Sequence, residues 1–258
     1  MKTRDKTGIL SKRGIATTTS ALMLASAALL AQPAMAEEAA PAAEEGMTIF
    51  GGELSGNVGF FTDYIYRGVT QTNNEAAIQG GIDWAHPSGV YVGAWGSNVD
   101  FVDGDQASIE VDGYIGFANS IDSIPELSYD VGVLYYWYPG ATENLNYDFL
   151  ELYGSVGYDF DFAAASIGLA WSPEFFGDTG DAFYYQLGLE VPLPYDVSLA
   201  GGYNFQEFDE GAQDDYQDWN IGLGYSLYGL DLSLVYSETV DLGTNDNEAL
   251  TFGVGYAF

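Results

Sequence analysis

The chain has no cysteine, which excludes disulfide bonds and thiol chemistry. Basic residues are almost as scarce, because 6 lysines and arginines stand against 38 aspartates and glutamates. Five of those six lie within residues 1–13, so Arg67 is the single basic residue in the rest of the chain. Phosphate binding needs clustered Lys and Arg, so a nucleic-acid partner is excluded and cations become the favoured partners.

Groups for acid–base or nucleophilic catalysis are also sparse. His86 is the only histidine and lies in the turn sequence HPSG. Ser88 beside it is a turn residue, and no third group is placed to orient a nucleophile. We therefore predict that the protein is not an enzyme and that it has no catalytic residue, cofactor site or metal site.

Long apolar runs are absent after the N-terminus. Residues 1–36 comprise a basic start, the uncharged run IATTTSALMLASAALLA and the motif AMA, which together are typical of a secretory signal peptide. The alternative is an uncleaved membrane anchor, but the run is short and the Ala-x-Ala motif favours cleavage. Beyond it, no run approaches the ~20 apolar residues of a membrane helix, so a helical membrane protein is excluded.

Cleavage after Ala36 would make the formal net charge more negative, from −32 to about −36, because five basic residues and one acid leave with the signal. Residues 37–53 then follow as an acidic N-terminal leader.

Residues 54–258 form segments of about ten residues in which apolar and polar positions alternate. This period of two residues is that of β-strands. Twelve candidate strands follow: 54–67, 76–86, 90–99, 107–117, 127–138, 147–158, 163–172, 182–191, 195–205, 216–227, 230–239 and 249–258.

The connections between these segments alternate in length. Longer acidic connections follow the odd-numbered segments and shorter ones follow most even-numbered segments, with the stretch NSIDSIPE as the exception. An even number of ten-residue strands with short turns at one end is typical of outer-membrane barrels. We predict an all-β fold, a transmembrane antiparallel up-and-down β-barrel of about 12 strands over residues 54–258. A soluble β-sandwich or lipocalin-like barrel is the alternative.

Residues 60–101 carry a more specific pattern, in TDYIYRG, IQGGIDW and SGVYVGAWGSNVDF, followed by IEVDGYIGF, YDFLELYGSVGY and the terminal GVGYAF. These motifs resemble the TorF-family porins, a proteobacterial outer-membrane family formerly described as conserved proteins of unknown function. The resemblance spans essentially the whole chain after the signal peptide. It implies an outer-membrane barrel with a pore, and it implies no defined solute.

Acidic residues on the polar face of the strands are the expected lining of the lumen, because a charge facing lipid is costly. The predicted pore-lining residues are Asp63, Asp83, Glu110, Asp112, Asp130, Glu151 and Glu190, together with Arg67. Rings of carboxylates favour cations, although barrel interiors are polar in any case. Arg67 is expected on the first strand near the outer mouth, either as a structural pin between acids or as a constriction that tunes selectivity.

Two acidic stretches, DFVDGDQ and FDEGAQDD, offer oxygen ligands of the kind that Ca²⁺ prefers, but neither has the spacing of an EF-hand loop. A solvated acidic rim is the simpler interpretation.

The last stretch, LTFGVGYAF, places Tyr256 and Phe258 on the lipid-facing side of the last strand. We interpret these two residues as a signal for the barrel assembly machinery, which rests on resemblance to other outer-membrane barrels.

We therefore predict an outer-membrane, porin-like channel, exported through the periplasm of a Gram-negative bacterium, for passive passage of small solutes with a preference for cations. The alternative is a structural or surface-interaction barrel that does not conduct. The expected partners are outer-membrane lipid and lipopolysaccharide, the barrel assembly machinery, and small cations or other small solutes. The sequence does not indicate an oligomeric state.

Overall fold

The computed structural model describes residues 47–104, 107–209, 213–242 and 247–258. The expected signal peptide and residues 37–46 of the expected leader lie outside the described residues. No helix in the described ranges is long and apolar enough to cross a membrane. The one helical element in these ranges is a short 3₁₀ turn, η1 (Glu143–Leu145).

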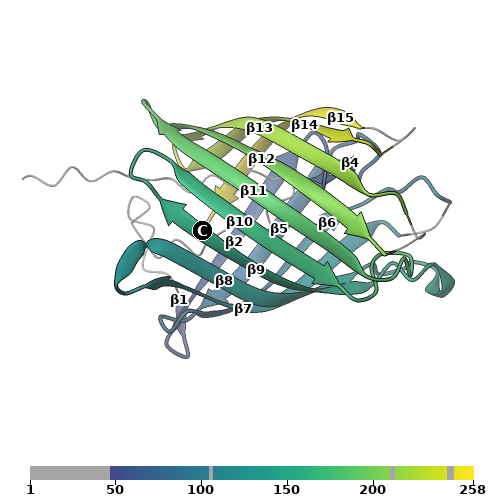
Figure 1. Ribbon diagram of the computed structural model, residues 1–258, viewed down its shortest axis with the longest axis horizontal. Coiled ribbons are helices and arrows are strands. Elements are labelled where there is room, and N and C mark those ends of the chain that lie inside the picture. The colour runs from purple at the N-terminus through teal and green to yellow at the C-terminus, as the bar shows by residue number, and fades with distance from the viewer. Residues whose placement is uncertain (1–46, 105–106, 210–212, 243–246) are drawn as a thin grey trace, which may run out of the picture.

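Twelve antiparallel strands close into a barrel, as predicted (Figure 1). They are β2 (Gly52–Phe61), β5 (Ala77–Ala85), β6 (Val90–Asn98), β7 (Ile109–Ile121), β8 (Ile124–Trp137), β9 (Phe149–Asp159), β10 (Ala164–Ser172), β11 (Ala182–Leu193), β12 (Val197–Phe208), β13 (Tyr216–Leu227), β14 (Leu230–Val240) and β15 (Glu248–Ala257). Each strand pairs with its neighbour in the chain, and β15 returns to β2. A further short strand, β1 (Met47–Ile49), pairs with the first residues of β2 outside this ring.

The alternation of side chains separates an apolar outer face from a polar inner face. On β11, Tyr185, Leu187 and Leu189 point outward and are 41%, 56% and 53% exposed. Tyr184 and Gln186 point inward and are 1% and 9% exposed. A period of two in the sequence therefore becomes two chemically distinct faces, because consecutive residues of a strand face opposite sides of the sheet.

The two ends of the barrel differ in the length of their connections. The tight-turn end has the connections 86–89, 122–123, 160–163, 194–196 and 228–229. The loop-rich end has the connections 62–76, 99–108, 138–148, 173–181, 209–215 and 241–247. The predicted exception at NSIDSIPE is wrong, because β7 runs to Ile121 and β8 starts at Ile124, which leaves a two-residue turn.

The predicted first strand, residues 54–67, is also wrong at its C-terminal end. Strand β2 stops at Phe61, and the chain then leaves the wall to form a small hairpin of β3 (Ile65–Tyr66) and β4 (Val69–Thr70). Arg67 and Gly68 form its two-residue turn with φ angles of 48° and 78°. Positive φ at both central positions is the geometry of a type I′ hairpin turn.

The seam between β15 and β2 closes the barrel through a short pairing. It contains the register pairs from Gly253↔Phe61 to Ala257↔Asn57, far fewer than the pairing of β11 with β12. Two further backbone hydrogen bonds of 2.8 Å extend it, because Phe258 donates to and accepts from Gly56. The Phe258 ring stacks on Tyr256 at a centroid distance of 6.1 Å.

We expect a chain shortened by Phe258 to be less stable than the Phe258→Ala variant. The shortened chain loses both hydrogen bonds to Gly56, whereas the alanine variant keeps them and loses the ring alone. At about 1 kcal/mol for each bond, the difference should be about 2 kcal/mol in the free energy of unfolding. Denaturant titration of the refolded barrels in detergent measures it, and equal stability of the two variants would contradict this account of the seam.

Candidate functional site

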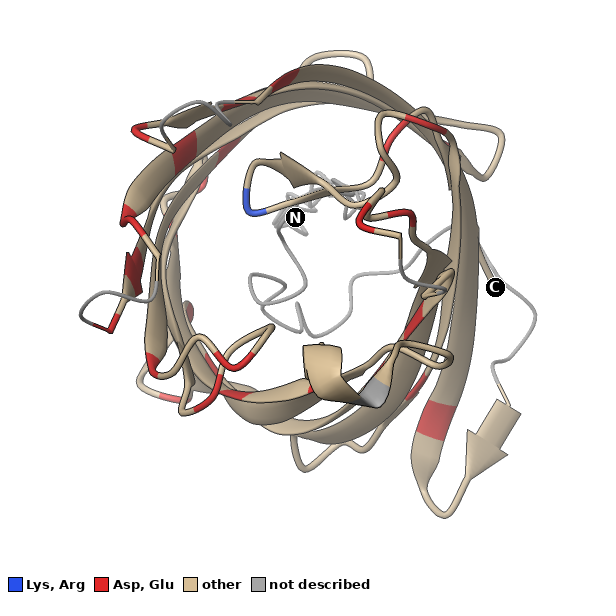
Figure 2. Ribbon diagram, turned by 90° about the vertical axis from the view of Figure 1, so that its right-hand side faces the viewer, with Lys and Arg blue, Asp and Glu red and all other residues tan. Residues whose placement is uncertain are grey.

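The hairpin β3–β4 folds into the barrel rather than away from it. In Figure 2, the blue segment that marks a basic residue lies inside the ring of strands. Arg67 is this residue, and it is 2% exposed. The expectation that Arg67 faces inward from the first strand is therefore corrected, since it reaches the interior from the tip of a hairpin.

Arg67 is held by side chains from three strands on the far wall. Its Nη2 atom donates to Glu151 Oε1 on β9 at 2.6 Å, and its Nη1 atom donates to Gln206 Oε1 on β12 at 2.9 Å. The guanidinium carbon also lies 4.3 Å from the ring centroid of Tyr184 on β11 and 4.8 Å from that of Tyr66. A buried guanidinium is stabilised when a carboxylate, a neutral acceptor and aromatic faces surround it, as they do here.

The backbone of the hairpin tip is anchored as well. The hydroxyl of Tyr216 donates to the carbonyl of Arg67 at 3.2 Å, and the amide of Asn247 donates to the carbonyl of Gly68 at 2.9 Å. A Cβ atom at Gly68 would lie 2.7 Å from the Cβ atom of Asp218, so glycine lets the tip approach β13 closely. The hairpin therefore crosses the lumen from β2 to the opposite wall.

Asp63 lies at the base of the hairpin, and it was also predicted on the first strand. The Oδ1 atom of this carboxylate accepts a hydrogen bond from the Thr70 hydroxyl at 2.7 Å and lies 2.9 Å from the Thr72 hydroxyl. Burial raises the pKa of the Asp63 carboxyl above its ordinary value, and these hydrogen bonds oppose the rise. Asp63 ties the two arms of the hairpin together, which differs from the wall position predicted for it.

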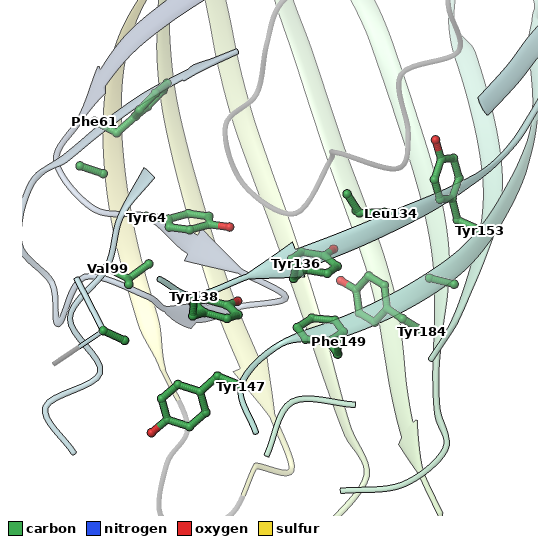
Figure 3. Packing of buried hydrophobic residues seen from close by; sticks show 13 residues of the cluster. Phe61, Tyr64, Val99, Leu134, Tyr136, Tyr138, Tyr147, Phe149, Tyr153 and Tyr184 are labelled. Carbon is green, nitrogen blue, oxygen red and sulfur yellow. The ribbon is translucent and has the colours of Figure 1, made fainter. Parts of the chain in front are cut away.

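An aromatic cluster fills the loop-rich half of the interior beside the hairpin (Figure 3). Tyr136 on β8 stacks on Phe149 on β9 with a centroid distance of 4.1 Å, and it meets Tyr66 of the hairpin at 5.8 Å. The loop residue Phe176 stacks on Tyr147 at 4.3 Å. These rings pack the hairpin against β8 and β9, so this half of the barrel resembles a core.

Four acids lie in the same half and are almost completely buried. Glu110 and Asp112 on β7, Glu151 on β9 and Asp218 on β13 are each 1% exposed. Glu110 Oε1 accepts from the Tyr64 hydroxyl at 2.8 Å. The structure therefore brings Arg67 together with three of the predicted pore-lining acids and with Asp218, which strand parity also predicts to face inward near the end of its strand.

The remaining predicted acids lie nearer the tight-turn end, where side chains are more open. Asp83 accepts from the Tyr114 hydroxyl at 2.5 Å, and Asp130, which is buried, accepts from the Tyr91 hydroxyl at 2.7 Å. Glu190 is half-buried on β11. These three acids point inward from their strands but do not meet Arg67.

The tyrosines of this half lie flat along the wall, because glycines make room for them. A Cβ atom at Gly116 would collide with the Tyr91 ring, and one at Gly93 would collide with the Tyr114 ring. Each tyrosine hydroxyl then reaches across the intervening strand to a carboxylate two strands away. The tight-turn half is accordingly lined by glycine, tyrosine and carboxylate, while the loop-rich half is filled by the hairpin.

The contacts of Arg67 with Gln206 and Tyr184 were not predicted from the sequence, although Tyr184 was expected as a bulky side chain in the lumen. Gln206 is fully buried at 0% exposure, and Tyr184 lies under the guanidinium. Both occupy inward positions of their strands, and the alternation of side chains could have indicated this. Their meeting with Arg67 depends on the hairpin crossing the lumen, which strand parity does not indicate.

The acidic loops show no metal centre in the parts that are described. Residues 105–106 of DFVDGDQ and 210–212 of FDEGAQDD lie outside the described residues. Elsewhere, over the ranges given above, no group of three or more His, Asp or Glu side chains is arranged to hold a metal ion.

Arg67→Gln should destabilise the barrel strongly, because Glu151 would remain as a buried carboxylate without its cation. Breaking such a pair from one side costs about 3–5 kcal/mol. The double variant Arg67→Gln with Glu151→Gln should recover most of that loss, because neither member of the ion pair is left as a buried charge without its partner. Urea unfolding of the refolded variants measures both effects, and equal losses in the single and double variants would argue against the ion pair as the anchor.

The fold is similar to solved outer-membrane channels. The KdgM porin superimposes with a TM-score of 0.57 at 9% identity, covering 79% of this chain and 99% of that chain. The NanC porin gives 0.52 at 10% identity over 79% and 98% of the two chains. The COG4313 outer membrane channel from Pseudomonas putida F1 gives 0.52 at 10% identity over 85% and 99%.

These likenesses establish a shared barrel fold. No curated protein sequence matches the chain significantly. The family model described as "Bacterial protein of unknown function (Gcw_chp)" matches residues 46–254. The chain therefore belongs to the Gcw_chp family.

Proposed function

We propose that the protein is a channel of the bacterial outer membrane that passes small solutes and favours cations. The closed sheet supports this, because a barrel satisfies all strand hydrogen bonds internally, as lipid requires. The outward belt of exposed Leu, Ile, Val and aromatic side chains also supports it. The similarity in fold to the KdgM and NanC porins points in the same direction.

The charge of the interior is the observation that carries the proposed selectivity. Asp83, Glu110, Asp112, Asp130 and Glu151 point inward, while Arg67 is the single Lys or Arg of the described chain. A passage lined in this way lowers the energy of a cation and raises that of an anion. The KdgM porin has been captured with oligogalacturonate, which is an anionic sugar polymer. The proposed solutes differ from that ligand in charge.

The hairpin β3–β4 is the proposed constriction. It spans the lumen between β2 and the far wall, and Arg67 fastens its tip. In this role Arg67 is both a structural anchor and an element of selectivity. A barrel that does not conduct is the second candidate, because the nearly complete burial of Glu110, Gln206 and Asp218 leaves little solvent around the hairpin.

In the proposed orientation, the loop-rich end faces the exterior and the tight-turn end faces the periplasm, as is usual for bacterial barrels. The acidic rim would then lie beside lipopolysaccharide, where divalent cations could bridge it to phosphate groups.

Export through the periplasm rests on the signal peptide expected at residues 1–36. Membership of the TorF-family porins remains a prediction from the motifs. We also propose that the predicted acids line the pore.

We also propose that Tyr256 and Phe258 act as a recognition signal for the barrel assembly machinery. Both rings are exposed on the outer face of the seam, at 48% and 68%. Phe258→Ala should therefore reduce the amount of folded barrel in outer membranes of expressing cells by several fold. The same variant should refold in detergent with nearly normal yield, and unchanged levels in the membrane would remove the recognition role.

Conductance in planar bilayers tests the channel itself. The wild-type barrel should conduct, and its reversal potential in a KCl gradient should report a preference for K⁺ over Cl⁻. Arg67→Ala should raise both the conductance and the preference for K⁺, because it frees the hairpin and removes the one positive charge. Glu75→Gln, on the exposed part of the same segment, is the matched control and should change neither.

A wild-type barrel that folds but does not conduct would favour the second candidate. A reversal potential that reports a preference for Cl⁻ would overturn the proposed selectivity. An Arg67→Ala barrel with wild-type conductance and lower thermal stability would leave Arg67 with the structural role alone.

A further inference from the structure

The buried acids around the hairpin differ in how their charges are compensated. Glu151 receives a hydrogen bond from Arg67 at 2.6 Å and a second from the Tyr136 hydroxyl at 3.1 Å. Asp218 receives the Tyr184 hydroxyl and the Asn204 amide, each at 2.8 Å. Both carboxylates therefore have partners for both oxygens, which is what a buried charge needs.

Asp112 has no such set of partners. Its Oδ1 atom is buried and has no hydrogen-bond partner among the described residues. The charged groups that act on it are Glu110, its neighbour on the same face of β7, and Glu151, and both are acids. The side-chain hydrogen-bond contact of Asp112 is with Glu110, so it adds no positive charge. Glu110 is itself satisfied by the Tyr64 hydroxyl. Since Arg67 is engaged by Glu151 and Gln206, the described residues offer Asp112 no positive charge.

Aromatic residues flank this position. The cross-strand partner of Asp112 on β6 is Trp95, and its partner on β8 is Tyr136. Directly opposite residues have Cβ atoms about 4.5–5.5 Å apart, so both side chains start beside the carboxylate. Arg67 lies among aromatic rings in the same half of the barrel, which shows how this interior accommodates a positive charge.

The kind of cation follows from the number of ligands. Ca²⁺ takes six to eight oxygen ligands, and no group of three acids in the described ranges is placed to hold a metal ion. Two carboxylates beside aromatic rings suit a singly charged and weakly hydrated ion, which gains from cation–π contact. We propose that Asp112 and Glu110 bind a weakly hydrated monovalent cation, of the size and charge of K⁺ or an ammonium group, inside the barrel.

This inference rests on the proposed cation preference and names a discrete site for it. The experiment reads binding separately from conduction. The refolded full-length barrel is melted in an uncharged detergent while KCl replaces N-methyl-D-glucamine chloride at constant ionic strength. An ion that binds only the folded barrel raises the melting temperature once its concentration exceeds the dissociation constant, and the rise then grows with the logarithm of the concentration.

The wild-type barrel should show this rise, and Asp112→Asn should abolish it. Glu110→Gln should raise the dissociation constant for K⁺, fitted from the rise, by at least threefold. Asp83→Asn is the matched control, because it removes a lumen carboxylate of the other half of the barrel, and it should keep the rise. If Asp112→Asn fails to fold, the wild-type titration and Glu110→Gln still decide the matter.

A wild-type melting temperature that does not respond to K⁺ would overturn the site. So would an equal rise with K⁺ in Asp112→Asn. A melting temperature that rises on acidification yet ignores K⁺ would show that a proton, rather than a metal or ammonium cation, neutralises Asp112. Loss of conductance or a preference for anions in bilayers would defeat the proposed channel, while the K⁺-dependent rise would still stand.

Discussion

The closure of β15 onto β2 is the constraint on which the other features of this structure depend. A sheet that exposes an apolar outer face to lipid has no water to satisfy its edge, so every strand must find a partner on both sides. The seam meets this requirement with a short register and the two bonds between Phe258 and Gly56. Once the ring is closed, every second side chain of a strand faces inward. The polar face of each strand therefore lines an enclosed space.

That enclosed space carries far more negative than positive charge, and the structure handles the imbalance in two ways. Near the loop-rich end, Arg67 concentrates its contacts on Glu151 and Gln206, and tyrosine hydroxyls or amides satisfy most other acids. Near the tight-turn end, acids accept hydrogen bonds from tyrosines that lie flat over glycines. Asp112 is the buried carboxylate for which neither arrangement suffices, and it is where an external cation is expected.

The hairpin explains both where strand periodicity succeeded and where it failed. Parity along residues 54–67 placed Asp63 and Arg67 on one inward face, and both residues do lie in the interior. Their route there is different, because β2 ends at Phe61 and an Arg–Gly turn reverses the chain. The short strands Ile65–Tyr66 and Val69–Thr70 flank this two-residue turn, which is a hairpin pattern that the sequence contains. The alternating apolar residues of the segment do not distinguish this hairpin from one straight strand, since both have the same period of two.

The sequence by itself determined the strand count, the apolar outer face, the two unequal ends and the acidic character of the interior. These follow from local periodicity, turn residues and composition, which act within about ten residues of chain. Only the tertiary structure decided that the hairpin turns inward, that Arg67 meets Glu151, Gln206 and Tyr184, and that Asp112 Oδ1 is left without a hydrogen-bond partner. These contacts join residues up to 139 positions apart, and their geometry exists only after the ring has closed.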